Sequence, residues 1–125
     1  MLPNGKAPYV LVADDEQTIA NTLVQILNAS GFDARAVYSG ENAVEAARAV
    51  PPDVLITDVV MPGINGIEAA IHIQSFAPAC RIILFSGQAS TADLLERAEA
   101  KGHRFEILTK PVHPQVLLDQ LGATV

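Results

Sequence analysis

Short apolar runs rich in β-branched residues alternate along this chain with longer segments in which apolar residues recur every three or four positions. Runs of the first kind are typical of buried strands, and the second spacing is typical of amphipathic helices. The predicted strands span residues 9–13, 34–38, 54–58, 81–86 and 106–109. Because strands and helices take turns along the chain, the pattern predicts repeated βα units, a parallel sheet and an α/β fold.

The segments of helical period have recognisable ends. Ser39 suits the N-cap of the second segment, and residues that end helices follow four of them, at Gly31, Pro51, Pro78 and Gly102. The predicted helices span residues 16–29, 40–50, 66–77, 91–101 and 112–121. The sequence therefore predicts five helices around five strands.

The composition fits one domain. A chain of 125 residues can bury roughly two-thirds of the surface that its unfolded form exposes, so one core is enough. We expect a single domain over residues 1–125, with an ordered core at about residues 8–121. No apolar run approaches the ~20 residues of a membrane helix, and the lone Cys80 has no disulfide partner. These features favour a cytoplasmic protein that does not enter a membrane.

Charge narrows the choice of partners. The net charge is −6, and the lysines and arginines are scattered along the chain. Because nucleic acid phosphates need a basic face, we expect no direct binding of DNA or RNA. The position of the acidic residues is more informative than their number.

Polar residues stand where the predicted strands end. Asp14 and Asp15 follow the first strand, Asp58 ends the third, Ser86 ends the fourth and Lys110 follows the fifth. In an open parallel sheet, ligands bind outside the carboxyl ends of the strands. Two unit charges about 4 Å apart repel by roughly 4 kcal/mol at an effective dielectric near 20. Three carboxylates in one pocket therefore indicate a bound cation, and their hard oxygen atoms suit Mg²⁺.

These residues give the chain a resemblance to a known family. It resembles the receiver domains of two-component response regulators over nearly its whole length. The motifs that carry the resemblance are Asp14-Asp15, Asp58 with the segment 61–66, Ser86-Gly87 and Lys110-Pro111. The resemblance implies a flavodoxin-like, doubly wound sheet of strand order 2-1-3-4-5 with five flanking helices. It also implies a cis peptide bond before Pro111.

The resemblance assigns roles to the residues at the strand ends. Asp58 is expected to take a phosphoryl group from the phosphohistidine of a sensor histidine kinase or phosphotransfer protein. Lys110 and the Ser86 hydroxyl are expected to bind phosphoryl oxygens. The implied Mg²⁺ ligands are Asp14 through water, Asp15, Asp58 and the backbone carbonyl of Val60.

The resemblance also implies a signalling switch. The added negative charge should draw in Ser86 and the loop that leads to the fourth helix, and so change a surface. That surface would act on a downstream protein target or on an output domain outside this sequence. The chain would assist its own phosphorylation and dephosphorylation without being a turnover enzyme.

Several positions depart from the family pattern or leave a property open. The aromatic residue that usually stands three positions before the lysine is Ile107 here, with Phe105 two residues further back. Segment 101–104 replaces the usual Gly-Ala pair before the last strand. A smaller residue at 107 predicts a weaker or differently routed response to phosphorylation. Val60 and Gln88 flank the expected path of the hydrolytic water, and the lifetime of the phosphorylated form stays open.

Three other functions fit parts of the pattern. A receiver-like interaction module that works without phosphorylation would not need the full set of Asp14, Asp15, Asp58, Ser86 and Lys110. A Mg²⁺-dependent phosphatase with an aspartyl-phosphate intermediate normally has a second Asp two residues after the nucleophile, where Val60 stands. Flavin or nucleotide binding would need a Gly-rich phosphate loop at residues 13–15.

The histidines, none of which has metal-ligand spacing, are His72, His103 and His113.

Overall fold

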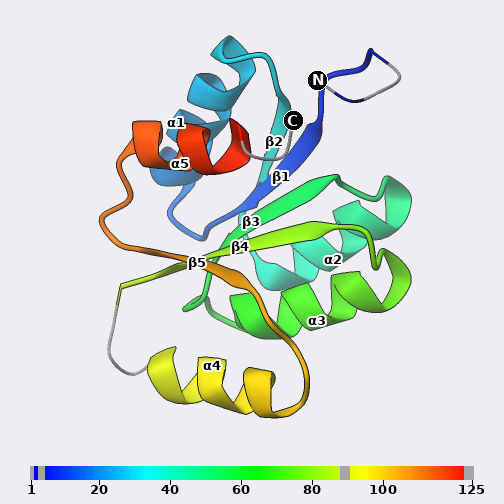
Figure 1. The fold of residues 1–125 in the computed structure, drawn as a ribbon, viewed down its shortest axis with the longest axis vertical. Helices are drawn as coiled ribbons and strands as arrows, with labels where there is room; N and C mark the ends of the chain where they lie inside the picture. Colours follow the sequence, from blue (N-terminus) through cyan, green and yellow to red (C-terminus); the bar gives the residue numbers. More distant parts are fainter. Residues whose placement is uncertain (1, 3–4, 88–90, 123–125) are drawn as a thin grey trace.

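The computed structural model describes residues 2, 5–87 and 91–122, and it forms a parallel sheet between two layers of helices (Figure 1). The strand order is β2-β1-β3-β4-β5, as predicted. The strands are β1 (Tyr9–Ala13), β2 (Asp33–Val37), β3 (Val54–Asp58), β4 (Arg81–Ser86) and β5 (Glu106–Thr109). The helices are α1 (Gln17–Ala29), α2 (Gly40–Ala49), α3 (Gly66–Phe76), α4 (Thr91–Ala100) and α5 (Pro114–Gly122).

The burial of each strand follows from its place in the sheet. All of β3 is buried, as is β1 after its first residue and β4 between its two ends, which explains their continuous apolar sequences. The edge strand β5 instead alternates between half-buried and exposed residues. The four strands other than β2 begin and end where the sequence predicts.

Strand β2 lies one residue earlier than the predicted 34–38, and pairing with β1 explains the shift. Asp33 stands opposite Tyr9 in the parallel ladder, and its amide donates a hydrogen bond to the Pro8 carbonyl at 2.9 Å. Tyr38 lies beyond the ladder, where its hydroxyl contacts the Asn21 side chain of α1 at 2.7 Å. The apolar pattern alone could not set the first residue of this strand.

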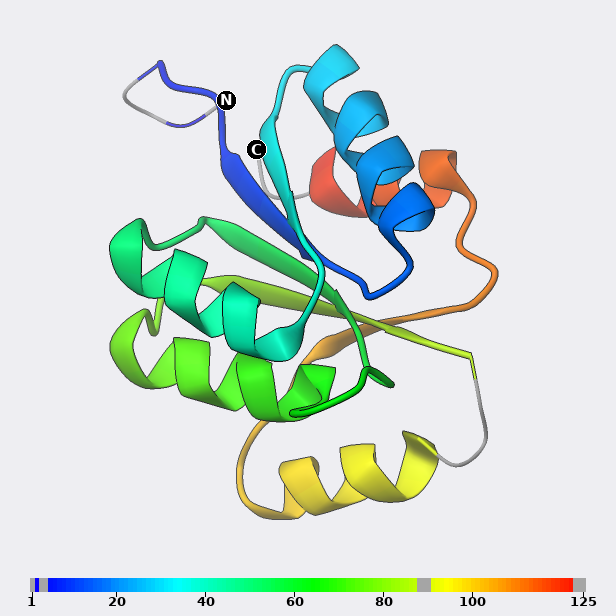
Figure 2. The same cartoon turned by 180° about the vertical axis from the view of Figure 1, so that it is seen from behind.

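Two clusters of apolar side chains hold the helices on the sheet. Helices α1 and α5 cover one face, where Leu23, Leu27 and Leu117 pack on β1, β3 and β4. Helices α2, α3 and α4 cover the other face, where Ala47, Ile73 and Ala98 are buried (Figures 1 and 2). With a layer on each face, the carboxyl ends of the strands form one rim between the layers.

The helix ends agree with the predicted ends to within two residues. Ser39 caps α2, because its hydroxyl accepts a hydrogen bond from the Asn42 amide at 3.0 Å. Helix α5 begins at Pro114 and not at 112, since proline suits a first helical position and His113 Nδ1 accepts from the Gln115 amide at 3.1 Å. Over the described ranges, none of the helices is both long enough and apolar enough to cross a bilayer.

Candidate functional site

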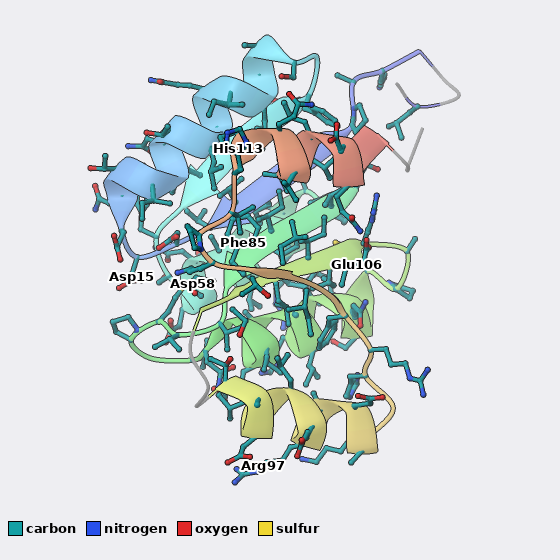
Figure 3. All side chains as sticks on the ribbon, turned by 60° about the vertical axis from the view of Figure 1, so that its left-hand side comes forward. Asp15, Asp58, Phe85, Arg97, Glu106 and His113 are labelled. Carbon is teal, nitrogen blue, oxygen red and sulfur yellow. The ribbon has the colours of Figure 1, made fainter. Side chains whose placement is uncertain are left out.

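The predicted acidic residues meet at the carboxyl ends of β1 and β3, where the strand order of the sheet reverses. One carboxylate oxygen from each of Asp14, Asp15 and Asp58 lies within 4.8 Å of the others. Figure 3 shows Asp15 and Asp58 at one end of the sheet, while Glu106 lies toward the other end. Within the described residues, this is the only group of three or more potential metal-ligating His, Cys, Asp or Glu side chains.

Lys110 supplies the cation of the site. Its Nζ lies 2.7 Å from Oδ2 of Asp58, and the peptide bond before Pro111 is cis, as predicted. Burial acts to lower the pKa of Lys110, but the hydrogen bond to Asp58 and the charge of that carboxylate outweigh it. The pKa of Lys110 therefore lies above its ordinary value of 10.5, and the side chain carries a full charge at neutral pH.

Asp14 is the most deeply buried of the three acids. Its residue is 2% exposed, and its Oδ1 accepts a hydrogen bond from the Glu16 amide at 3.0 Å. Burial raises the pKa of Asp14 above its ordinary value of 3.8, and the charge of Asp58 adds to the rise. The Glu16 amide acts in the opposite direction without reversing the shift. A buried carboxylate with a raised pKa is held in an environment that disfavours its charge.

The charges of the cluster do not balance among themselves. Three carboxylates face one ammonium group, which leaves two negative charges without a counterion in the cluster. Only hard oxygen donors converge there, and this ligand set suits a divalent cation such as Mg²⁺ better than a softer metal. The residues present therefore fit the metal that the sequence predicts.

The backbone around Asp58 is packed too closely for any side chain at position 66. The Gly66 amide donates to the Val59 carbonyl at 2.8 Å, and a Cβ at Gly66 would lie 2.0 Å from the Asp58 carbonyl oxygen. The Thr57 hydroxyl donates to the same Asp58 oxygen at 2.9 Å. Asn65 begins α3 with a reciprocal capping box to Glu68. These contacts fix the loop that follows Asp58.

A cleft of about 380 Å³ opens over the cluster. Its lining residues are Asp15, Glu16, Asp58, Val60, Gly87, Thr91 and Lys110. Val60, a predicted metal ligand through its carbonyl, thus lies at the cleft. Ser86 does not line the cleft. Its hydroxyl forms a hydrogen bond with the hydroxyl of Thr91, and Thr91 lines the cleft. Gln88, which the sequence places beside the hydrolytic water, lies outside the described residues.

Sequence reasoning missed Thr91. It is the first residue of α4 and is 2% exposed, although the next two residues, Ala92 and Asp93, are exposed. A threonine at a helix start is an ordinary sequence feature. Only the folded chain shows that this hydroxyl reaches both Ser86 and the acidic cleft.

The two residues near the usual aromatic position behave differently. Phe105 packs against the apolar cluster beneath α4, and its ring stacks on His103 with centroids 6.3 Å apart. Ile107 is 45% exposed and lines a cleft of about 190 Å³ together with Phe105 and Leu95. The departure seen in the sequence is therefore a real change of surface, because position 107 presents a small aliphatic group to solvent.

The fold and the site together define a doubly wound α/β protein with an acidic rim at its switch point, and comparison with known proteins agrees with the fold. The chain matches the family model of the response regulator receiver domain over residues 10–122. It therefore belongs to this family, the receiver domains of two-component systems. This result confirms the resemblance predicted from the sequence motifs.

Curated relatives and solved structures show the same relationship. The chain is 28% identical to the DNA-binding response regulator MtrA of Mycobacterium tuberculosis, over 91% of this chain and 49% of MtrA. It is 36% identical to the autoinducer 1 sensor kinase/phosphatase LuxN of Vibrio harveyi, over 73% of this chain and 11% of LuxN. The chain thus spans about half or less of the length of these relatives.

Among solved structures, the chemotaxis protein CheY4 of Vibrio cholerae superposes with a TM-score of 0.82 at 25% identity. That match covers 95% of this chain and 99% of CheY4. A receiver domain from Clostridium thermocellum gives the same TM-score at 28% identity, over 93% of this chain and 92% of that one. The β2-β1-β3-β4-β5 fold is therefore that of known receiver domains.

Proposed function

We propose that the chain is a phosphorylation-dependent switch that accepts a phosphoryl group on Asp58. One observation supports this most strongly: Asp58 is paired with Lys110 at 2.7 Å and shares a pocket with two further carboxylates. The donor is the phosphohistidine of a sensor histidine kinase or of a phosphotransfer protein. A carboxylate oxygen of Asp58 attacks phosphorus, the phosphorus–nitrogen bond breaks, and the electron pair stays on the donor histidine.

The other residues of the site assist by position and charge. The Lys110 ammonium, already beside Asp58, neutralises the oxygens of the transferred group, whose charge spreads in the transition state. Ser86 follows Phe85, the residue opposite Asp58 in the sheet, and its hydroxyl would donate a hydrogen bond to one of those oxygens once it turns from Thr91. Asp58 needs no separate base, because its carboxylate is the nucleophile.

The acidic cluster would hold Mg²⁺ through Asp15, Asp58 and the carbonyl of Val60, with Asp14 binding the ion through water. When bound, the ion reduces the repulsion between these carboxylates and an incoming phosphate. Asp14 is held by the Glu16 amide and cannot easily swing away, which keeps the cluster assembled. The ion would also offset the mutual repulsion of Asp14 and Asp58, both of which are buried.

The chain acts stoichiometrically in this proposal and not as a turnover enzyme. It assists the gain and the loss of its own phosphoryl group, and the changed surface is read by a downstream protein or by an output domain. The reaction takes place in the cytoplasm, where ATP supplies the phosphoryl group to the kinase. Receiver sequences within a sensor kinase and within a DNA-binding regulator support partners of this kind.

The test uses acetyl phosphate as a small-molecule donor, with and without Mg²⁺, followed by intact mass measurement. We expect a phosphate-sized mass increase that requires Mg²⁺ and is lost in Asp58→Asn. Asp33→Asn, an exposed carboxylate on β2, is the matched control and should still be phosphorylated. Uptake that survives Asp58→Asn would place the acceptor elsewhere. No uptake with any donor, including phosphohistidine proteins, would favour the interaction module.

A further inference from the structure

Thr91 is a buried polar residue that the proposed reaction does not use. Among the described residues, the buried polar or charged ones are Asp14, Thr57, Asp58 and Thr91. Asp58 is the acceptor, Asp14 belongs to the same acidic cluster, and the Thr57 hydroxyl donates to the Asp58 carbonyl. Thr91 lines the same cleft from a different element, the first turn of α4, and its hydroxyl is bonded to that of Ser86.

The main chain of Ser86 is fixed by its pairing with β5. Ser86 stands opposite Thr109 of β5, and its carbonyl accepts a hydrogen bond from the Lys110 amide at 3.0 Å. Its side chain can still rotate about one bond between staggered positions. Movement of the Ser86 hydroxyl toward Asp58 therefore requires a side-chain rotation, and the bond to Thr91 opposes that rotation.

A serine hydroxyl carries one proton and can donate it to one strong acceptor. A phosphoryl group on Asp58 offers acceptor oxygens with nearly two negative charges, and hydrogen bonds to charged groups are stronger than neutral ones. Either hydroxyl can be the donor in the bond between Ser86 and Thr91, but that bond needs the two oxygens side by side, so a Ser86 hydroxyl that turns to a phosphoryl oxygen leaves Thr91. The start of α4 then loses a partner that it has in the resting chain.

Helix α4 is well placed to respond to this loss. Within it, only Thr91 and Ala98 are buried, while Leu94 and Leu95 are partly buried against the core. At the usual aromatic position, Ile107 is exposed and has no polar group that could follow Ser86. The hydroxyl pair thus offers a route from the acceptor to α4 that does not pass through position 107.

We propose that Thr91 is a positioning residue that couples phosphorylation of Asp58 to α4, because its hydrogen bond to Ser86 exists in the resting state and is broken in the phosphorylated state. This inference rests on the proposed function. In the resting chain, Thr91 holds Ser86 away from the acceptor and so weakens binding of the phosphoryl group. On phosphorylation, release of Thr91 alters the first turn of α4 and the surface beside it.

The test compares wild type with Thr91→Val, which keeps the shape of the side chain and removes the hydroxyl. Beryllofluoride with Mg²⁺ is the phosphoryl mimic, and its apparent affinity is measured by titration calorimetry. Because a neutral hydrogen bond contributes modestly to stability, its loss from the resting state should tighten binding by about 3- to 10-fold. Thr91→Ser should restore wild-type affinity. Thr109→Val, beside Ser86 on β5, is the matched control.

A second readout follows α4 itself by amide hydrogen exchange at residues 91–95. In wild type and Thr91→Ser, the mimic should change the exchange rates of these amides. In Thr91→Val they should already resemble the mimic-bound form and change little. If Thr91→Val does not fold, the coupling is tested with wild type and Thr91→Ser alone. Exchange rates in α4 that do not change when the mimic binds would overturn the coupling.

The outcomes separate this inference from the proposed function. Unchanged or weaker affinity in Thr91→Val, with normal phosphorylation of Asp58 in wild type, overturns the role of Thr91 and leaves the switch intact. Absence of phosphate uptake in wild type, measured by mass, would overturn both the proposed function and the role of Thr91. Tighter binding in Thr91→Val together with equally tight binding in Thr91→Ser would show that the methyl group and not the hydroxyl matters, and would also overturn the inference.

Discussion

The two ends of the sheet carry charged residues in opposite arrangements. At the carboxyl end, Asp14, Asp15 and Asp58 face the single ammonium of Lys110. At the amino end, Arg81 and Glu106 form a bidentate pair, with both nitrogen–oxygen distances at 2.5 Å. The Arg81–Glu106 pair is further satisfied by α5. Arg81 donates to the Gln120 carbonyl at 3.0 Å, and the Gln120 side chain donates to Glu106 at 2.8 Å.

The pKa values of the acids at the two ends shift in opposite directions. The hydrogen bond from Arg81 lowers the pKa of Glu106, so the amino end favours the charged form of its acid. Burial and neighbouring charge raise the pKa of Asp14, so the carboxyl end disfavours it. Charges that complete each other at the amino end stabilise the fold. Charges left in excess at the carboxyl end indicate a place where something from outside must bind.

The largest expected effect comes from removing the ammonium group that faces Asp58 at the carboxyl end. Lys110→Met should slow phosphorylation by acetyl phosphate on the order of 10²-fold, because one preorganised donor to the transition-state oxygens is lost. The rate of mass increase in Mg²⁺ measures this effect. Lys101→Met, an exposed lysine beyond α4, is the control and should react at the wild-type rate. A Lys110→Met rate within a factor of two of wild type would contradict the role of Lys110.

The next effect tests how tightly the backbone is packed beneath Asp58. Gly66→Ala should lower the free energy of unfolding by about 1–3 kcal/mol, since overpacking forces the backbone to shift. Here the shift falls on the Asp58 carbonyl, so phosphorylation should slow as well. Gly122→Ala, whose Cβ would meet nothing within 4 Å, is the control for urea unfolding. Equal unfolding midpoints for the two variants would show that the loop absorbs the methyl group.

The carboxyl end was largely predictable because each strand ends in the sequence where an apolar run meets a polar residue. Buried parallel strands read as continuous apolar segments, so Asp58 and Lys110 could be assigned to strand ends directly. Parallel strands share one carboxyl edge, and this placed their side chains together. The cis bond before Pro111 and the family itself came from the motifs and are confirmed.

The contacts between distant elements could not be predicted in the same way. Nothing in the sequence places Thr91 beside Ser86, or the Glu41 carboxylate 3.2 Å from the Ile64 amide, because both depend on how helices settle on the sheet. The network of Arg81, Glu106 and Gln120 joins three elements and has no local pattern. The bounds of β2 were missed by one residue, since pairing with β1 and not the apolar pattern sets where the strand begins.

At the amino end, Glu106→Gln should remove the ion pair and leave phosphorylation unchanged. We expect a loss of about 1–2 kcal/mol at pH 7, because hydrogen bonds to charged groups are strong but this pair is partly screened by solvent. The pKa of Glu106 is lowered in the folded chain, so its stabilisation is present above the ordinary value of 4.5 and disappears as the pH falls through the lowered folded value. The difference between wild type and variant should therefore vanish in acid.

Thermal unfolding at several pH values measures this difference. Glu99→Gln is the control, because its partner Arg104 lies at 3.8 Å and both side chains are exposed. Exposed pairs contribute little, so this variant should match wild type at all pH values. If Glu106→Gln slowed phosphorylation, the amino end would not be purely structural and the contrast between the two ends would fail.

The smallest effect has the opposite sign. In buffer containing a chelator at pH 7, Asp14→Asn should raise the free energy of unfolding by about 0.5–1 kcal/mol, because it removes one buried like charge and desolvation cost. Asparagine keeps an oxygen that can accept from the Glu16 amide, so the loop should hold its shape.

Added Mg²⁺ should then stabilise wild type more than the variant, since a ligand that binds only the folded state raises stability according to its affinity. Urea unfolding across a Mg²⁺ titration measures both. A variant that is less stable than wild type without metal would mean that the acids are compensated within the fold, and the excess of charge at this end would no longer indicate a cation.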